Sequence, residues 1–264
     1  MSGILLIAGY DRAPHAIAVA EGMRRAGCSV DQIIIAYPLT IARARAILRR
    51  HGAAAVLRYL RGERSEQVRS PLRAYIEAQG IVDISLSAWA RRFGIPCTRV
   101  GDINGERAVR CIQHQRPQLT LYTGGGILRR PVIEAAGRRI LNAHSGPLPV
   151  IRGMNACEWS LLLGEPLSVT LHLVDEGVDT GAIIAKRRMA VRQGDTVEML
   201  RQKCIVAGIQ LMVEHAARAV AGELSLAKEA DAASQRQSFV MAPALRELLA
   251  QRLPELIERQ GRIG

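Results

Sequence analysis

The chain is short of aromatic residues, closely spaced cysteines and long apolar runs, and each shortage excludes a class of protein. Phe, Trp and Tyr make up only 3% of 264 residues, which leaves little material for stacking the bases of single-stranded nucleic acid. The five cysteines stand far apart without a C-x-x-C pair, and neither His51 nor His114 has a partner at metal-ligand spacing. We therefore predict no disulfide framework, no metal site and a reduced, cytoplasmic setting.

Apolar runs are too short to enter a membrane. No run approaches the roughly 20 residues of a membrane span, and the apolar start at residues 4–8 is too short for the core of a signal peptide. We therefore expect no membrane partner. The chain does contain 48% hydrophobic residues, which can fill a sizeable core.

Basic residues are in excess, and the formal net charge is +12. Such an excess can attract nucleic acid, an anionic membrane or an acidic small molecule. The arginines, however, are scattered along helical stretches, where charged residues usually form solvated faces. Together with the scarcity of aromatic residues, this favours no nucleic-acid partner. A small-molecule substrate that carries an anionic group stays open as another reason for the arginine excess.

Short apolar runs alternate with helical patterns along the chain. Strands are predicted at residues 4–8, 32–37, 96–100, 118–122, 139–142, 168–174 and 182–186. Helices are predicted at residues 14–25, 104–115, 155–163, 196–221 and 243–259, with two more within 40–79. The alternation indicates an α/β fold, an open and mostly parallel twisted sheet with helices on both faces. We divide the chain into a catalytic domain, residues 1–222, and a helical C-terminal extension, residues 223–264.

Three polar residues form a pattern suited to attack on a carbonyl group. Asn142 and His144 alternate on a predicted strand, so both side chains point to one face. Asp179 follows a later strand that can lie beside the first. A histidine with a carboxylate is a general acid–base arrangement, and an asparagine amide can donate to an oxygen that gains negative charge. Taken singly, Asn142 fits a residue that satisfies a turn, and His144 fits an ordinary loop histidine.

Direct transfer is favoured over a covalent intermediate, because no Ser or Cys stands in an elbow of G-x-S-x-G type. Glycines after the strand at 118–122 let another molecule approach the backbone closely. Over residues 118–222 the sequence resembles the 10-formyltetrahydrofolate-dependent formyltransferases. The resemblance lies in the order and spacing of Gly124 to Leu128, Asn142 and His144, Pro149, Arg152 with Gly153, and residues 169–181.

The resemblance implies an enzyme with 10-formyltetrahydrofolate as formyl donor. It implies that Asn142 and His144 steady the oxyanion, that Asp179 helps to move a proton from the attacking amine, and that His172 supports the site. It also implies a folate pocket formed mainly by the backbone of two loops, comprising Gly125, Gly126, Ile127, Leu128, Val174, Asp175, Glu176, Gly177 and Val178.

Two departures from the family pattern concern loops. The stretch after the histidine reads Ser145 to Pro149 with an added proline and a shifted hydroxyl. The loop after the first strand carries Tyr10, Asp11 and Arg12, where a glycine- and serine-rich phosphate loop would be needed for glycinamide ribonucleotide. We expect these three residues to contact a different acceptor, because they follow the carboxyl end of a strand.

The acceptor is expected to be a small amine, such as an amino sugar, an amino acid or a biosynthetic intermediate. Methionyl-tRNA is not expected, because only about 40 residues follow Gly222, too few for a second domain. Two alternatives stay open: a folate-binding regulatory or partner protein of the same fold, and a related one-carbon or carbamoyl transferase. The oligomeric state also stays open, with a homodimer as one alternative.

Overall fold

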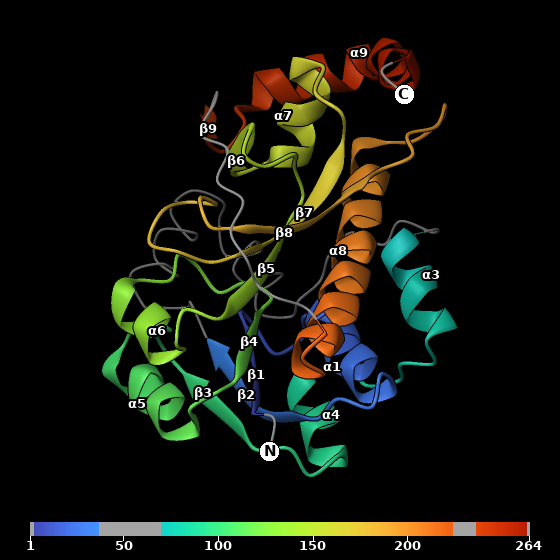
Figure 1. The fold of residues 1–264 in the computed structure, drawn as a ribbon. Helices are drawn as coiled ribbons and strands as arrows, with labels where there is room; N and C mark the ends of the chain where they lie inside the picture. The colour runs from blue at the N-terminus through green and yellow to red at the C-terminus, as the bar shows by residue number, and fades with distance from the viewer. Residues whose placement is uncertain (1–2, 37–69, 224–235, 263–264) are drawn as a thin grey trace, which may run out of the picture.

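The computed structural model describes residues 3–36, 70–223 and 236–262, and a seven-stranded sheet lies at its centre (Figure 1). Its strands are β1 (Ile4–Ala8), β2 (Val30–Ala36), β3 (Cys97–Val100), β4 (Leu119–Tyr122), β5 (Ile140–His144), β7 (Ser168–Leu173) and β8 (Ile183–Arg188). They are ordered β3-β2-β1-β4-β5-β7-β8. The first five run parallel, and β7 is antiparallel to both of its neighbours, β5 and β8. The predicted open, mostly parallel sheet is confirmed.

Helices cover both faces of the sheet (Figure 1). One face carries α1 (Pro14–Arg25), α3 (Pro71–Ala78), α4 (Leu86–Arg92) and the long α8 (Val197–Val220), which pack around the larger apolar core. The other face carries α5 (Glu106–Gln115) and α6 (Arg130–Ala135) around a smaller one. Every residue of β1 and β4 is buried, as expected for strands covered on both faces. Helices on both faces are therefore confirmed as well.

The strands β2 and β3 lie on one side of β1, and the strands from β4 onward lie on the other side. The order of the strands therefore reverses between the neighbours β1 and β4. In open α/β sheets, ligands bind outside the carboxyl ends of the strands at such a point. The loops that follow these two strands touch there, since a Cβ on Gly9 would lie 2.8 Å from the Gly125 nitrogen. Two glycines thus allow the backbones to meet.

A small second sheet lies beyond the end of β5. It consists of β6 (Ile151–Gly153) and β9 (Arg236–Ser238), paired in parallel. The helix α7 (Ala156–Leu163) follows β6, and α9 (Pro243–Arg262) packs on α7 at the top of Figure 1. Residues of the predicted C-terminal extension therefore pack on α7 and pair with β6.

The observed elements match most of the predicted ranges, and α1 matches its range at both ends. The short elements α4, α6, β6 and β9 had no counterpart in the sequence analysis. Residues 37–69 lie outside the described part of the chain, so the helices predicted within 40–79 are tested only at α3. In the three described stretches, no helix is both long enough and apolar enough to cross a membrane.

Candidate active site

The strand β5 presents Asn142 and His144 on one face, as predicted. Leu141 and Ala143 pack against the larger core on the opposite face. The antiparallel neighbour β7 places His172 directly opposite Asn142. His144 and His172 are both buried, and their ring centroids lie 6.4 Å apart. Two strands therefore bring three polar side chains together at one end of the sheet.

Asp179 joins this group from the loop between β7 and β8. Its Oδ2 atom lies 3.3 Å from His144 Nδ1, and its Oδ1 atom lies 3.5 Å from His172 Nε2. The backbone N–H of Gly153 donates to Oδ2 at 2.8 Å. Asp179 has a φ of 54°, a left-handed conformation that aspartate and asparagine tolerate better than most residues. The three residues predicted from the sequence, with His172, thus form one cluster.

The tautomer of His144 follows from its backbone partner. His144 Nε2 lies 3.0 Å from the carbonyl oxygen of Ile151, and a carbonyl can only accept, so this nitrogen carries the hydrogen. The other nitrogen, Nδ1, therefore faces the Asp179 carboxylate with a lone pair when the ring is neutral. Burial lowers the pKa of His144 below its ordinary value of 6.5, while Asp179 and the Ile151 carbonyl oppose that shift. The His144–Asp179 pair is consequently poised to take up one proton.

Asn142 is oriented by His172. Nδ1 of His172 lies 2.8 Å from the Leu173 carbonyl oxygen and so carries the hydrogen, which leaves Nε2 to accept. The amide Nδ2 of Asn142 donates to it at 3.1 Å. Burial is the main cause that lowers the pKa of His172 below 6.5, which keeps the ring neutral. An amide nitrogen has two N–H donors, so Asn142 keeps its second N–H for another acceptor.

The altered loop at residues 145–149 is fixed to β7 by Thr170. The Thr170 hydroxyl donates to the Gly146 carbonyl at 2.8 Å and accepts the Leu148 N–H at 3.1 Å. The peptide bond between Leu148 and Pro149 is cis. A single buried hydroxyl thus holds the loop that leads from His144 to β6.

The predicted glycine loop has an open backbone. Gly124, Gly125 and Gly126 all have φ between 112° and 138°, a region that L side chains rarely adopt. The Tyr122 hydroxyl donates to the Gly126 carbonyl. The end of the loop is held at the Ile127 carbonyl, which accepts from Asn104 at 2.9 Å. Ile127 itself is 68% exposed, whereas the neighbouring Leu128 is buried.

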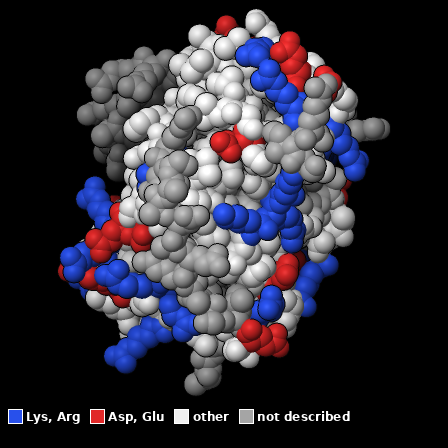
Figure 2. All heavy atoms as spheres, turned by 45° about the horizontal axis from the view of Figure 1, so that its top comes forward, with Lys and Arg blue, Asp and Glu red and all other residues white. Residues whose placement is uncertain are grey.

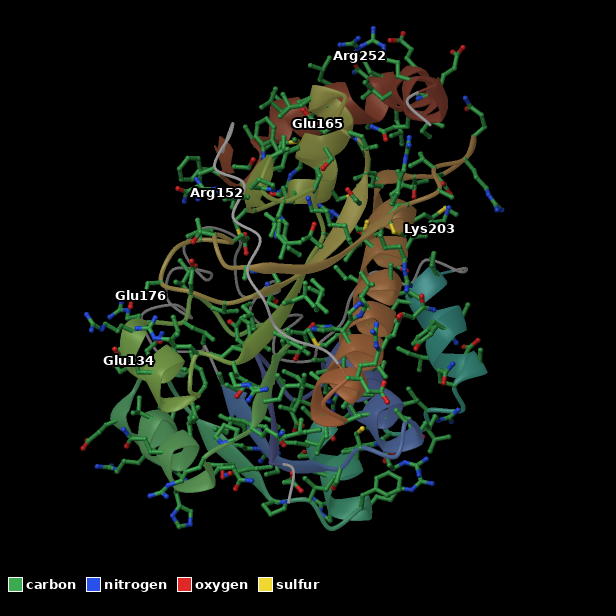
Figure 3. The ribbon with its side chains drawn as sticks, viewed as in Figure 1. Glu134, Arg152, Glu165, Glu176, Lys203 and Arg252 are labelled. Carbon is green, nitrogen blue, oxygen red and sulfur yellow. The ribbon has the colours of Figure 1, made fainter. Side chains whose placement is uncertain are left out.

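The second predicted donor loop, residues 174–178, is closed by its own side chains. Val174 N–H donates to the Ile140 carbonyl at 2.8 Å. Asp175 accepts from Gly177 N–H at 3.1 Å and from the Thr180 hydroxyl, so its carboxylate forms the turn. Glu176 pairs with Arg130, the first residue of α6, at 3.8 Å and with Arg138, which follows that helix, at 3.5 Å. Both arginines also pair with Glu134 of α6, and Figure 3 labels Glu176 and Glu134 near each other, so this second loop adjoins the helix.

The loop after β1 is hydrogen-bonded to the start of α4 and to β3 through Asp11. The Asp11 carboxylate accepts from Ser87 N–H at 2.8 Å and from Arg99 at 2.9 Å, which fixes the start of α4. Tyr10 packs on the core with its ring edge toward His15, and Arg12 is exposed. The structure thus gives Asp11 a role that its sequence position did not reveal.

Two functional backbone groups were missed by the sequence analysis. The Ile151 carbonyl fixes the tautomer of His144, and the Gly153 N–H binds Asp179. Backbone partners leave no residue-type signal in a sequence, and a three-residue strand is too short for periodicity to predict. Among the described residues, no three His, Cys, Asp or Glu side chains are grouped to hold a metal ion.

The fold and the site together define an open α/β protein with a cluster of Asn142, His144, His172 and Asp179 at the carboxyl end of β5, in which the two histidines are buried. Residues 104–216 match the family model described as formyl transferase. This match spans the glycine loop and all four residues of the cluster, so this part of the chain is similar to the formyltransferases.

Curated relatives and solved structures are similar to this chain as well. The methionyl-tRNA formyltransferase of Thermodesulfovibrio yellowstonii is 28% identical over 127 residues, 47% of this chain and 41% of the relative. The chain therefore spans less than half the length of that curated relative. A glycinamide ribonucleotide transformylase of Symbiobacterium toebii superposes with a TM-score of 0.58 at 20% identity, over 87% of this chain and 95% of its own.

A third similar protein is an N-formyltransferase of Helicobacter canadensis, solved with folinic acid and dTDP-3-aminofucose. It superposes with a TM-score of 0.58 at 16% identity, over 90% of this chain and 71% of its own. At these identities, the solved structures establish a shared fold.

Proposed function

We propose that this protein transfers the formyl group of 10-formyltetrahydrofolate to the amine of a small acceptor that carries an anionic group. The proposal rests on the distance of 3.3 Å between His144 Nδ1 and Asp179 Oδ2. The other imidazole nitrogen, Nε2, donates its hydrogen to the Ile151 carbonyl. An amine that attacks a formyl carbon must lose a proton, and this pair is built to accept one. The bond between the formyl carbon and N10 of the donor breaks after the new C–N bond forms, and the pair can return the proton to N10.

Asn142 has the complementary role. As the amine attacks, the formyl oxygen gains negative charge, and a fixed amide N–H directed at that oxygen stabilises it. His172 holds the Asn142 amide through a 3.1 Å hydrogen bond, so the donor is oriented before the reaction begins. Because His144 and His172 are both buried, the transfer takes place away from bulk water, where such hydrogen bonds are stronger. Asn142, His144 and Asp179 therefore form the catalytic set.

The described residues fit a folate donor. Gly125 to Leu128 and Val174 to Val178 are the residues that we assign to its pterin. Three successive glycines with positive φ leave the first loop without side chains that would block a flat ring. Fixed backbone N–H and C=O groups of such loops are well suited to the donors and acceptors of a pterin edge. The bound donor supplies the formyl carbon.

Donor binding is the first test. A non-transferable analogue of 10-formyltetrahydrofolate is expected to bind with a Kd of about 1 μM, about 8 kcal/mol, in isothermal titration calorimetry. Tyr122→Phe removes the hydroxyl that holds Gly126 and is expected to weaken binding severalfold. Tyr75→Phe on α3 is the matched control and is expected to bind like the wild type. Absence of binding by the wild type would overturn the donor assignment, and binding without transfer to any amine would favour a folate-binding regulatory protein.

Arg152 is the residue that we assign to the anionic group of the acceptor. It stands on β6 between the two residues whose backbones contact His144 and Asp179 (Figure 3). Its Nε atom is buried without a hydrogen-bond partner, which costs about 1–3 kcal/mol and more for a charged group. A planar guanidinium matches carboxylates and phosphates. On the face drawn in Figure 2, Lys and Arg side chains are spread in several groups among acidic ones. We therefore choose Arg152 for its buried, unpaired Nε atom and its place on β6, and not for the net charge of the chain.

An Arg152→Gln variant is therefore expected to raise KM for the acceptor about tenfold or more, with a much smaller effect on kcat. The donor Kd should not change. Arg110→Gln, an exposed residue of α5 that pairs with Glu106, removes the same charge elsewhere and is expected to behave like the wild type. Steady-state kinetics with an amino-sugar phosphate or nucleotide as acceptor measures both constants. An unchanged acceptor KM in Arg152→Gln would refute the assignment.

A further inference from the structure

We infer that β9, the strand supplied by the C-terminal extension, positions His144 and Asp179 by holding β6 in place. The inference rests on the proposed function for the roles of these two side chains. It concerns residues 236–238, which are far from the family motifs and outside the part of the chain that the family model matches.

The backbone of β6 forms hydrogen bonds on two sides, to the site and to β9. Toward the site, the Ile151 carbonyl accepts from His144 at 3.0 Å, and the Gly153 N–H donates to Asp179 at 2.8 Å. Toward β9, the N–H of Met154 donates to the Ser238 carbonyl at 3.0 Å. Backbone groups of successive strand residues alternate in direction. The backbone groups of residues 151 and 153 therefore point toward the site when those of residues 152 and 154 point toward β9.

Contact between the two strands is close. Arg152 pairs with Gln237, and Gly153 pairs with Ser238. A Cβ on Gly153 would lie 2.2 Å from the Ser238 carbonyl oxygen, and the φ of Gly153 is 91°. Glycine is thus required at the point where β6 passes between Asp179 and β9. The position of the Gly153 N–H is set from both sides.

The extension is itself anchored next to β9. The Trp159 indole N–H donates to the Phe239 carbonyl at 2.9 Å, and the Met241 N–H donates to the Asn155 side chain at 3.1 Å. Further along, the Gln260 side chain accepts from Leu167 N–H at 3.0 Å. These bonds tie the extension to α7 and to the start of β7. The strand β9 therefore has a fixed place relative to the sheet that carries His144.

Without β9, the three-residue strand β6 would retain its bonds to the two side chains that it orients and one bond from the Ile151 N–H to the Pro147 carbonyl at 3.0 Å. A displacement of about 1 Å at reacting groups can reduce a rate about 100-fold. We therefore assign β9 a positioning role, expressed in kcat and in the order of the Gly153 amide rather than in donor affinity.

Proline substitutions one residue apart test this role in the full chain. Since the Ser238 carbonyl bonds to Met154, the Ser238 N–H also faces β6, while the Gln237 N–H faces away. Ser238→Pro is expected to lower kcat about tenfold or more and to leave the donor Kd within about twofold. Gln237→Pro and Ser238→Ala are the matched controls, and both are expected to keep kcat near that of the wild type.

Hydrogen exchange of the Gly153 amide gives a readout that needs no turnover. Its exchange is expected to become about tenfold faster in Ser238→Pro and to stay unchanged in Gln237→Pro. Trp159→Phe, which removes the bond to Phe239 and part of a ring packed on the core, is a milder variant and should show the same two effects at smaller size if Ser238→Pro does not fold. Unchanged Gly153 exchange and kcat in a folded Ser238→Pro would overturn the inference. If the wild type transfers no formyl group but the exchange effect is present, the proposed reaction fails while the positioning role stands.

Discussion

An Asp179→Asn variant is expected to lose formyl transfer by about 100- to 10,000-fold in kcat, the contribution of a well-placed general base. The change removes the negative charge opposite His144 Nδ1, 3.3 Å away, and the site can no longer accept the amine proton efficiently. The fold should survive. Asparagine tolerates the left-handed backbone at this position, and its side-chain oxygen can still accept the Gly153 N–H.

The same variant should change the pH dependence of the rate. Activity requires the His144–Asp179 pair without its added proton, so kcat falls as pH falls through the pKa of the pair. Burial lowers the pKa of His144 below 6.5 and Asp179 raises it, so removal of the carboxylate should move the remaining acid limb to lower pH. Asp83→Asn, at a pair with the exposed Arg92, makes the same chemical change elsewhere and should leave the pH–rate profile unaltered. A full-rate Asp179→Asn enzyme would disprove the proposed role.

Gly181→Ala is expected to reduce kcat by about 100-fold or more and to weaken donor binding as well. A Cβ at this position would lie 1.8 Å from the Leu173 carbonyl oxygen, a contact with backbone that no rotamer change can relieve. The turn from Val174 to Gly181 must therefore open, which displaces Asp179 together with the assigned donor loop. Kinetics and calorimetry with the donor analogue measure the two effects.

Gly101→Ala serves as the control for a methyl group on a loop glycine. Nothing lies within 4 Å of a Cβ there, and the backbone is outside the positive-φ region. This variant should keep its activity, and its free energy of unfolding should change by less than about 0.5 kcal/mol. Equal losses in the two variants would show that the steric account of Gly181 is wrong.

Much of the fold was predictable because the central strands carry plain signals. The buried strands β1 and β4 are short continuous apolar runs, and α1 begins at Pro14 and ends with Arg24 and Arg25, signals that favour helix starts and ends. The juxtaposition of Asn142 with His144 followed from alternation along one strand. Asp179 was placed with them because it follows a later strand that can lie beside the first, and the resemblance implied the same set. The pairing of β5 with β7 itself is a long-range contact that no local pattern encodes.

The rest of the site could not be derived in this way. The tautomer of His144 depends on the backbone of Ile151, and the carboxylate of Asp11 has a structural partner in Ser87. Neither relation is visible in residue types or spacing. The strand β9 has three residues and forms only because β6 offers an edge, so tertiary pairing rather than propensity determines it.

The pairing of β6 with the extension also has a consequence for protein synthesis. The contacts that join the extension to α7 and β7 link residues 80 to 95 positions apart in the chain. A ribosome adds about 5–20 residues per second, so the α7 and β7 partners in these contacts emerge roughly 4 to 19 seconds before their partners in the extension. A nascent chain is therefore expected to fold its sheet first and to become competent for formyl transfer only after the last residues of the extension have left the exit tunnel.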